Sequence, residues 1–155
     1  MPDYPPKQVY WEDVSEGMEI PKLVKHPTPQ SLVRYAGASG DFNVIHYNET
    51  LAKAQRLPGI IVHGALKNAY LGQLLTDCVG LHGRVRKYGA QYRGMDFPDD
   101  DLACRGLVTR KYEEGGEFLV DLEIWTENPS GEKTSPGFAT VALPSRKALA
   151  AQLQG

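Results

Sequence analysis

The strongest hydrophobic pattern in the chain is helical and lies between residues 64 and 79. In the stretch "ALKNAYLGQLLTDCV", apolar residues recur every four positions, at Leu66, Tyr70, Leu74 and Cys78. Further apolar residues flank this row, and Gly80 is placed to end the helix. A helix that is apolar over so much of its circumference must be largely buried. We therefore predict a long central helix over residues 64 to 79.

Downstream of this helix the pattern changes to the alternation that is typical of β-strands. Four segments show it, at residues 84–94, 101–112, 117–128 and 132–143. The third segment is the clearest, because Phe118, Val120, Leu122 and Ile124 fall on one face. Glycine-rich turn signals separate the last three segments.

Upstream of the central helix the pattern predicts shorter elements. A short strand should end near His26, and a helix should start at Thr28 with Pro29 in its first position and run to about Ala38. Its expected inner face is Leu32, Val33, Tyr35 and Ala36. A second short helix capped by Asn48 and an extended piece over 60–62 follow. This order predicts an α+β domain in which an antiparallel sheet wraps a central helix.

Composition fits one globular domain of 155 residues, with a core over about residues 14–143, an N-terminal extension 1–13 and a C-terminal tail 144–155. The net charge is -2, from 17 basic and 19 acidic side chains mixed along the chain, which argues against a nucleic-acid surface. No apolar run is long enough to span a membrane, and the N-terminus shows no secretory pattern. We expect a cytoplasmic protein.

Cysteines and histidines do not form a recognisable metal pattern. Cys78 and Cys104 stand in apolar surroundings far apart in the sequence, which favours buried free thiols. No two of the four histidines have the spacing of a helical metal pair. Because the chain also lacks a glycine-rich phosphate loop and a nicotinamide fingerprint, we expect neither a metal nor a bound cofactor.

The segment "YAGASGDFNVIH" holds the first candidate for chemistry. Asp41 and His46 are five residues apart, which on one continuous helix would place them about 140° apart around the axis. They can converge only if Gly40 ends the helix. Taken alone, Gly40, Asp41 and Asn43 are also ordinary turn residues, and a lone His46 is more often structural than catalytic.

The second candidate is "IIVHGAL", where His63 and Gly64 directly precede the long helix. The start of a helix offers unpaired N–H groups and the positive end of the helix dipole. Glycine there lets a substrate oxygen approach the backbone closely. For His63 itself we expect a structural role, in which a hydrogen bond orients this corner without any part in proton transfer.

Together these two motifs resemble the (R)-specific enoyl-thioester hydratases and dehydratases, the MaoC-like branch of the hotdog fold. The resemblance covers about residues 14 to 143. It implies that Asp41 and His46 are the catalytic pair, that Asn43 supports the site by hydrogen bonding, and that the Gly64 N–H binds the thioester carbonyl. The substrate would be an enoyl group carried by coenzyme A or acyl carrier protein.

Three positions depart from the usual motifs of this family. Val44 stands where proline is usual, Ala65 stands where methionine or leucine is common, and "FPDDDL" (97–102) replaces a glycine-containing turn. We expect the first to loosen the loop, the second to alter the pocket, and the third to be a structural change remote from the acid–base pair.

The resemblance also implies an assembly and leaves rival functions open. Members of this fold typically pair, so we expect a homodimer, with a heteromer of related hotdog subunits as the main alternative. One rival is a hotdog acyl-thioesterase, which has no evident use for the paired D-x-N-x-x-H. The other is a non-catalytic acyl-binding subunit, which would be expected to have lost Asp41 or His46.

Overall fold

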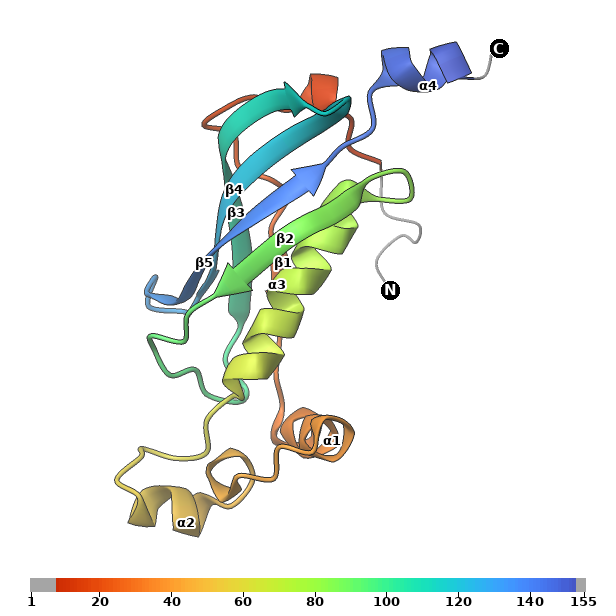
Figure 1. The fold of residues 1–155 in the computed structure, drawn as a ribbon. Helices are drawn as coiled ribbons and strands as arrows, with labels where there is room; N and C mark the ends of the chain where they lie inside the picture. The colour runs from red at the N-terminus through yellow and green to blue at the C-terminus, as the bar shows by residue number, and fades with distance from the viewer. Residues whose placement is uncertain (1–7, 153–155) are drawn as a thin grey trace.

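The structure is a computed structural model that describes residues 8–152 (Figure 1). Its elements are, in chain order, η1 (Trp11–Asp13), β1 (Leu23–Lys25), α1 (Pro29–Ser39), η2 (Val44–His46), α2 (Glu49–Ala54), α3 (Gly64–Val79), β2 (Arg84–Ala90), β3 (Leu102–Glu114), β4 (Glu117–Glu127), β5 (Lys133–Ala142) and α4 (Arg146–Gln152). The strands form one antiparallel sheet in the order β1-β3-β4-β5-β2.

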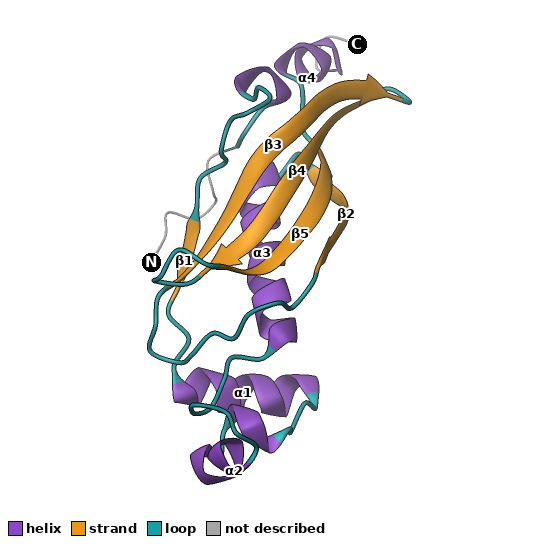
Figure 2. Ribbon diagram, turned by 90° about the vertical axis from the view of Figure 1, so that its left-hand side faces the viewer, coloured by secondary structure: helices purple, strands orange, loops and turns teal. Residues whose placement is uncertain are grey.

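The curled sheet wraps around α3, which lies along its concave face (Figure 2). The main core cluster joins the buried face of α3, including Leu71, Leu74 and Leu75, to inward-facing residues of β3, β4 and β5. In β4, Val120, Leu122 and Ile124 are buried, and Phe118 is half-buried. The predicted α+β hotdog arrangement and its central helix are confirmed.

Helix α1 begins and ends where the sequence predicts. Thr28 and Ser31 form a capping box, in which Ser31 N donates to Thr28 Oγ1 at 3.2 Å and Thr28 N donates to Ser31 Oγ at 2.9 Å. Gly40 ends the helix in the left-handed region, at φ 78°. The prediction for Val33 is wrong: this side chain is 55% exposed, because only Leu32, Tyr35 and Ala36 face the interior.

The two ends of the molecule differ in what they carry. Helices α1 and α2 lie beyond the foot of α3, whereas η1 and α4 lie at the opposite end (Figures 1 and 2). There Trp11 N donates to Pro144 O at 3.0 Å, and Arg146 pairs with Asp13. The predicted extension 1–13 and tail 144–155 are described only in part, since residues 1–7 and 153–155 lie outside the described range.

The residues over 60–62 link α2 to α3 and take no part in the sheet. Ile61 N donates to Ile45 O at 3.1 Å, and Val62 N donates to Asp96 O at 2.8 Å, so this link is held from two sides. Among the described helices, none has the length and apolar character needed to cross a membrane.

Candidate active site

The loop from Gly40 to His46 is built by a chain of local hydrogen bonds. Asp41 N donates to Ser39 Oγ at 3.2 Å, Asn43 N donates to Asp41 Oδ1 at 3.3 Å, and Ile45 N donates to Asn43 Oδ1 at 3.3 Å. Asn43 is thereby the N-cap of η2, the short turn that carries His46. Each polar side chain fixes the backbone two residues away, which is how Asp and Asn stabilise turns.

This loop brings Asp41 and His46 together. The distance from His46 Nε2 to Asp41 Oδ2 is 3.9 Å, which is too long for a direct hydrogen bond but allows one water to contact both atoms. The His46 side chain is buried, whereas 45% of the Asp41 side chain is exposed. The pair therefore combines a fixed imidazole with a carboxylate that solvent and substrate can reach.

The ring of His46 is oriented by the link 60–62. His46 Nδ1 lies 2.8 Å from Ile61 O. A carbonyl oxygen only accepts hydrogen bonds, so Nδ1 must carry the proton and donate. In the neutral ring Nε2 is then an acceptor, and it is the nitrogen that faces Asp41.

His63 connects the two motifs. It is fully buried, its ring stacks on His46 with centroids 3.7 Å apart and planes 19° apart, and its Nε2 lies 3.4 Å from the Asp41 carbonyl oxygen. Burial lowers the pKa of His63, and the neighbouring His46 lowers it further. We expect a structural role in which a hydrogen bond of His63 orients this corner, and the contact with the Asp41 carbonyl and the stacking on His46 are consistent with that role.

Gly64 is the first residue of α3, and its predecessor His63 forms no side-chain cap. The N–H groups of the first helical turn therefore keep their capacity to bind an acceptor at the positive end of the helix dipole. A Cβ on Gly64 would lie 2.6 to 2.9 Å from ring atoms of Tyr92, so any larger residue here would require the Tyr92 ring to shift. This glycine permits the close approach of an aromatic ring.

Two tyrosines that the sequence analysis did not place at the site, Tyr35 and Tyr92, lie beside His63 and Gly64. The ring of Tyr35 packs edge-on against His63, with centroids 4.9 Å apart. Burial raises the pKa of Tyr35, and the charges of Tyr92 and Asp41 add to the effect. Tyr35 was expected only as an inner-face residue of α1, and its spacing gave no sign of this contact.

A buried ion pair lies one turn further along α3. Lys67 Nζ donates to Asp96 Oδ2 at 2.7 Å and to Gly94 O at 2.8 Å, and both charged side chains are almost completely buried. The sequence gives one indication of this buried ion pair, because Lys67 falls on the same helix face as Leu71 and Leu74, four and seven positions later.

The turn 97–102 contacts the start of α1, where Asp99 N donates to Pro27 O at 2.7 Å.

Within the described part of the chain, Asp41, His46 and His63 form one group whose ligand atoms all lie within 4.8 Å of one another. The geometry suits a metal ion poorly. Imidazole lone pairs lie in the ring plane, and an ion in the plane of one stacked ring would lie well outside the plane of the other. The absence of a metal stays a prediction.

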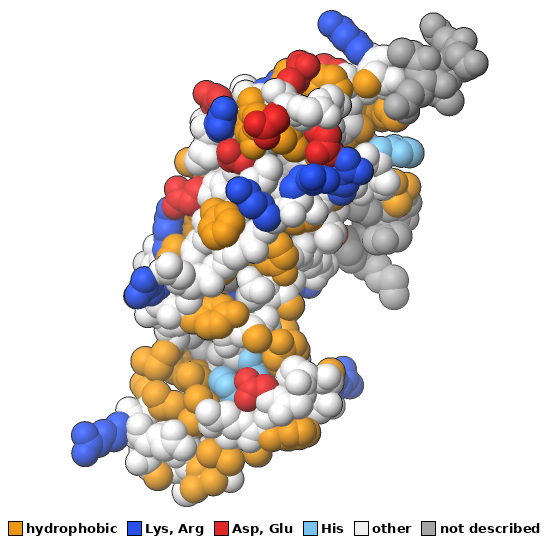
Figure 3. All heavy atoms as spheres, viewed as in Figure 1, with side chains coloured by type: hydrophobic (Ala, Val, Ile, Leu, Met, Phe, Trp, Pro, Cys, Tyr) orange, Lys and Arg blue, Asp and Glu red, His pale blue; other side chains and the backbone are white. Residues whose placement is uncertain are grey.

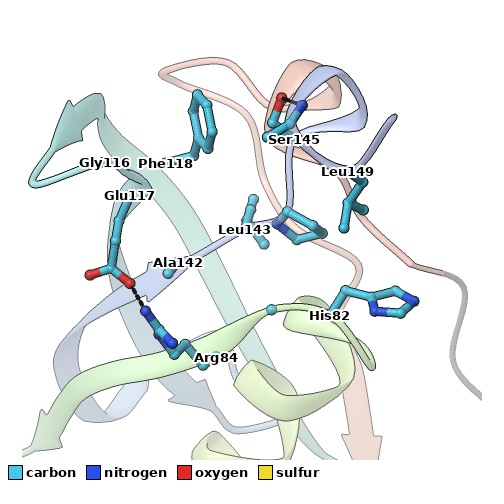
Figure 4. Close-up of a pocket in the computed structure, with 12 residues that line it drawn as sticks. His82, Arg84, Gly116, Glu117, Phe118, Ala142, Leu143, Ser145 and Leu149 are labelled. Carbon is cyan, nitrogen blue, oxygen red and sulfur yellow. Dashed lines mark hydrogen bonds and ion pairs between the residues drawn. The ribbon is translucent and has the colours of Figure 1, made fainter. Parts of the chain in front are cut away.

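The site opens on the face of the molecule drawn in Figure 3. Near the foot of the molecule an acidic side chain and histidine side chains lie side by side, bordered by hydrophobic side chains (Figure 3). A separate pocket of about 330 Å³ lies near α4, at the other end of the sheet, and includes His82 and the ion pair between Arg84 and Glu117 (Figure 4). It contains none of the predicted site residues.

Comparison with known proteins bears on the family and the fold of the chain. A family model described as "MaoC like domain" matches residues 2–122. Among curated proteins, the fatty acid synthase subunit beta of Aspergillus oryzae is 36% identical over 123 residues, which are 77% of this chain and 6% of that protein. The Saccharomyces cerevisiae subunit is 35% identical over 65% of this chain and 5% of its own length. The chain thus spans only a small part of these relatives.

Two solved structures share the fold over nearly their whole length. An (R)-hydratase from A. caviae involved in PHA biosynthesis has a TM-score of 0.78 at 22% identity, covering 86% of this chain and 99% of its own. A chain of the ChsH1-ChsH2 complex from Mycobacterium tuberculosis has a TM-score of 0.72 at 21% identity, with coverages of 83% and 98%. At these identities the likeness establishes the fold alone.

Proposed function

This chain belongs to the MaoC-like domain family, and from that premise we propose that it adds water across the 2,3-double bond of a trans-2-enoyl thioester, or removes it in the reverse reaction. The observation that carries the proposal is the pairing of His46 Nε2 with Asp41 Oδ2 across 3.9 Å. In the neutral form of His46, Nε2 is an acceptor, and together with a carboxylate at this separation it forms a site for one water molecule.

The proposed reaction uses both members of the pair. The bound water attacks C3 and its proton passes to His46 Nε2 or Asp41 Oδ2, and the pair then passes that proton to C2. The pair ends the turnover in the protonation state in which it began. From the family resemblance we expect the (R)-3-hydroxyacyl thioester as the product.

The thioester carbonyl gains negative charge when C3 is attacked. We assign its binding to the Gly64 N–H, at the start of a 16-residue helix whose first turn has no side-chain cap. Loss of one such donor typically raises the barrier by about 3 kcal/mol. Asn43 supports this arrangement indirectly, because its side chain caps the turn that carries His46.

The substrate carrier and the assembly are part of the same proposal. We propose coenzyme A or acyl carrier protein as the carrier and no further cofactor. We also propose that the chain pairs with a second copy or with a related hotdog subunit and acts in the cytoplasm in lipid metabolism. The similarity to segments of fatty acid synthase beta subunits supports an acyl-thioester substrate.

The test is the decay of enoyl-thioester absorbance with crotonyl-CoA, for wild type, Asp41→Asn and His46→Gln. We expect decay with the wild type only, and (R)-3-hydroxybutyryl-CoA as its product by chiral chromatography. Both substitutions preserve size and hydrogen-bonding capacity, so circular dichroism should show that the variants remain folded.

Other results would direct the assignment elsewhere. Release of free thiol by the wild type without hydration would favour the thioesterase. Hydration that survives in both variants would contradict the assignment of Asp41 and His46.

A further inference from the structure

The connection between β2 and β3 is held rigidly where it passes the foot of α3. On its sheet side, Gln91 N donates to Pro136 O, and Arg93 N and Gly94 N both donate to Thr134 O, each at 2.9 Å. Tyr92 lies between two of these anchored residues. Its backbone position is therefore set by β5.

The same connection is held from the other side by α3. Lys67 Nζ donates to Gly94 O and to Asp96 Oδ2, and Asp96 O accepts from Val62 N at 2.8 Å. A buried ion pair is costly to form and more costly to break, so it resists movement of this connection. The segment that carries Tyr92 is therefore held between the sheet and α3.

The ring of Tyr92 lies against Gly64, although 53% of this residue is exposed. A Cβ built on Gly64 would come within 2.6 Å of Tyr92 Cδ2 and within 2.8 Å of Cγ. The contact is therefore between the face of the glycine and one edge of the ring, from Cγ to Cε2. Because the ring packs on Gly64, it lies beside the residue whose N–H we assign to the thioester carbonyl.

From this contact we infer that Tyr92 determines specificity by excluding enoyl thioesters that carry a branch at C2. The inference rests on the proposed function, in which the Gly64 N–H binds the thioester carbonyl. C2 is bonded directly to the carbonyl carbon, so a substituent on C2 is the first part of the acyl group to meet a ring packed on Gly64.

The test compares crotonyl-CoA with 2-methylcrotonyl-CoA, which differ by one methyl group at C2. One such group in a shaped pocket changes kcat/KM by roughly 10- to 200-fold. We expect wild type to favour crotonyl-CoA, and Tyr92→Ala to lower this preference by about 10-fold or more. Tyr92→Phe keeps the ring and should keep the preference.

The same helix offers a matched control. Tyr88 is 37% exposed and lies against a second glycine of α3, where a Cβ on Gly72 would be 2.8 Å from Tyr88 Oη. Gly72 lies about 12 Å further along the helix than Gly64. Tyr88→Ala removes the contact of a tyrosine with a glycine of the same helix, made here by the hydroxyl end of the ring, and should leave the ratio of the two substrates at the wild-type value.

The possible results separate this inference from the proposed function. If wild type hydrates neither substrate, the proposed function fails. If wild type hydrates crotonyl-CoA and Tyr92→Ala keeps its preference, the proposed function stands and the inference about Tyr92 is overturned. The inference is also overturned if Tyr88→Ala relaxes the preference as much as Tyr92→Ala does.

Discussion

Two aspartates near the foot of α3 illustrate two ways of placing a carboxylate. Asp41 lies on a loop, its side chain is 45% exposed, and its neighbours in sequence hold it through turn hydrogen bonds. Asp96 is 3% exposed and bonds to Lys67, which is 29 residues away. The first carboxylate is accessible for chemistry, and the second fixes the frame around it.

The difference lies in what each carboxylate faces. Asp41 Oδ2 faces His46 across a gap that a water can fill, so its free energy of interaction with the fold is small. Asp96 Oδ2 is buried away from solvent, and its charge is compensated by the Lys67 ammonium group. Equivalent substitutions at the two positions should therefore affect different properties.

The largest effect is expected from Asp41→Asn, on the reaction rate. Removing one member of an acid–base pair typically lowers the rate by about 10²- to 10⁴-fold. The asparagine oxygen can still accept from Asn43 N, and an exposed position tolerates the change within about 0.5 kcal/mol of unfolding free energy. Hydration kinetics and urea denaturation of the same preparation measure both quantities. A large loss of stability would show that Asp41 is a structural carboxylate like Asp96.

The next effect is expected from Asp96→Asn, on stability. Breaking a buried pair by neutralising one partner leaves the other charge buried without compensation, which costs about 3–5 kcal/mol of unfolding free energy. Urea denaturation against wild type measures the loss. The double variant Lys67→Met/Asp96→Leu removes both charges and should recover much of it. If the single variant is as stable as wild type, the pair does not hold the connection to α3.

The same contrast explains which features the sequence predicts. Three features are local patterns: the helical periodicity of α3, the capping signals at Thr28 and Pro29, and the loop from Asp41 to His46. The structure shows each of these elements in its expected place. The partners of Lys67 and Gly64 come from the connection after β2, and no short-range pattern specifies them. A charged residue on the apolar face of a helix was the one available sign of a buried partner.

A third effect is expected on the pH dependence of stability, and it comes from the buried His63 rather than from the exposed Asp41. Burial and the neighbouring His46 lower the pKa of His63 below its ordinary value of 6.5, and its other titratable neighbours are Asp41 and Tyr35. A lowered pKa means that the unfolded chain binds the proton more tightly. Stability from this residue is fully present above pH 6.5 and is lost as the pH falls toward the lower value of the folded protein.

The measurement is urea denaturation of wild type and His63→Asn across this pH range. The difference between their unfolding free energies should be largest near neutral pH and shrink as the pH falls, because the variant has no group at position 63 to protonate. A difference that stays constant with pH would show that His63 supports the site by packing alone.

The smallest effect is expected from Thr28→Ala, at the start of the helix that leads to the catalytic loop. The substitution removes the Thr28 half of the capping box with Ser31, and loss of such a cap typically costs about 1 kcal/mol. Thr28→Ser keeps the oxygen that accepts from Ser31 N and serves as the matched control. Because the turn bonds around Asp41 are all local to Ser39 and the residues after it, catalysis should change little while unfolding free energy falls. A rate that falls in proportion to stability would show that the loop depends on the whole of α1.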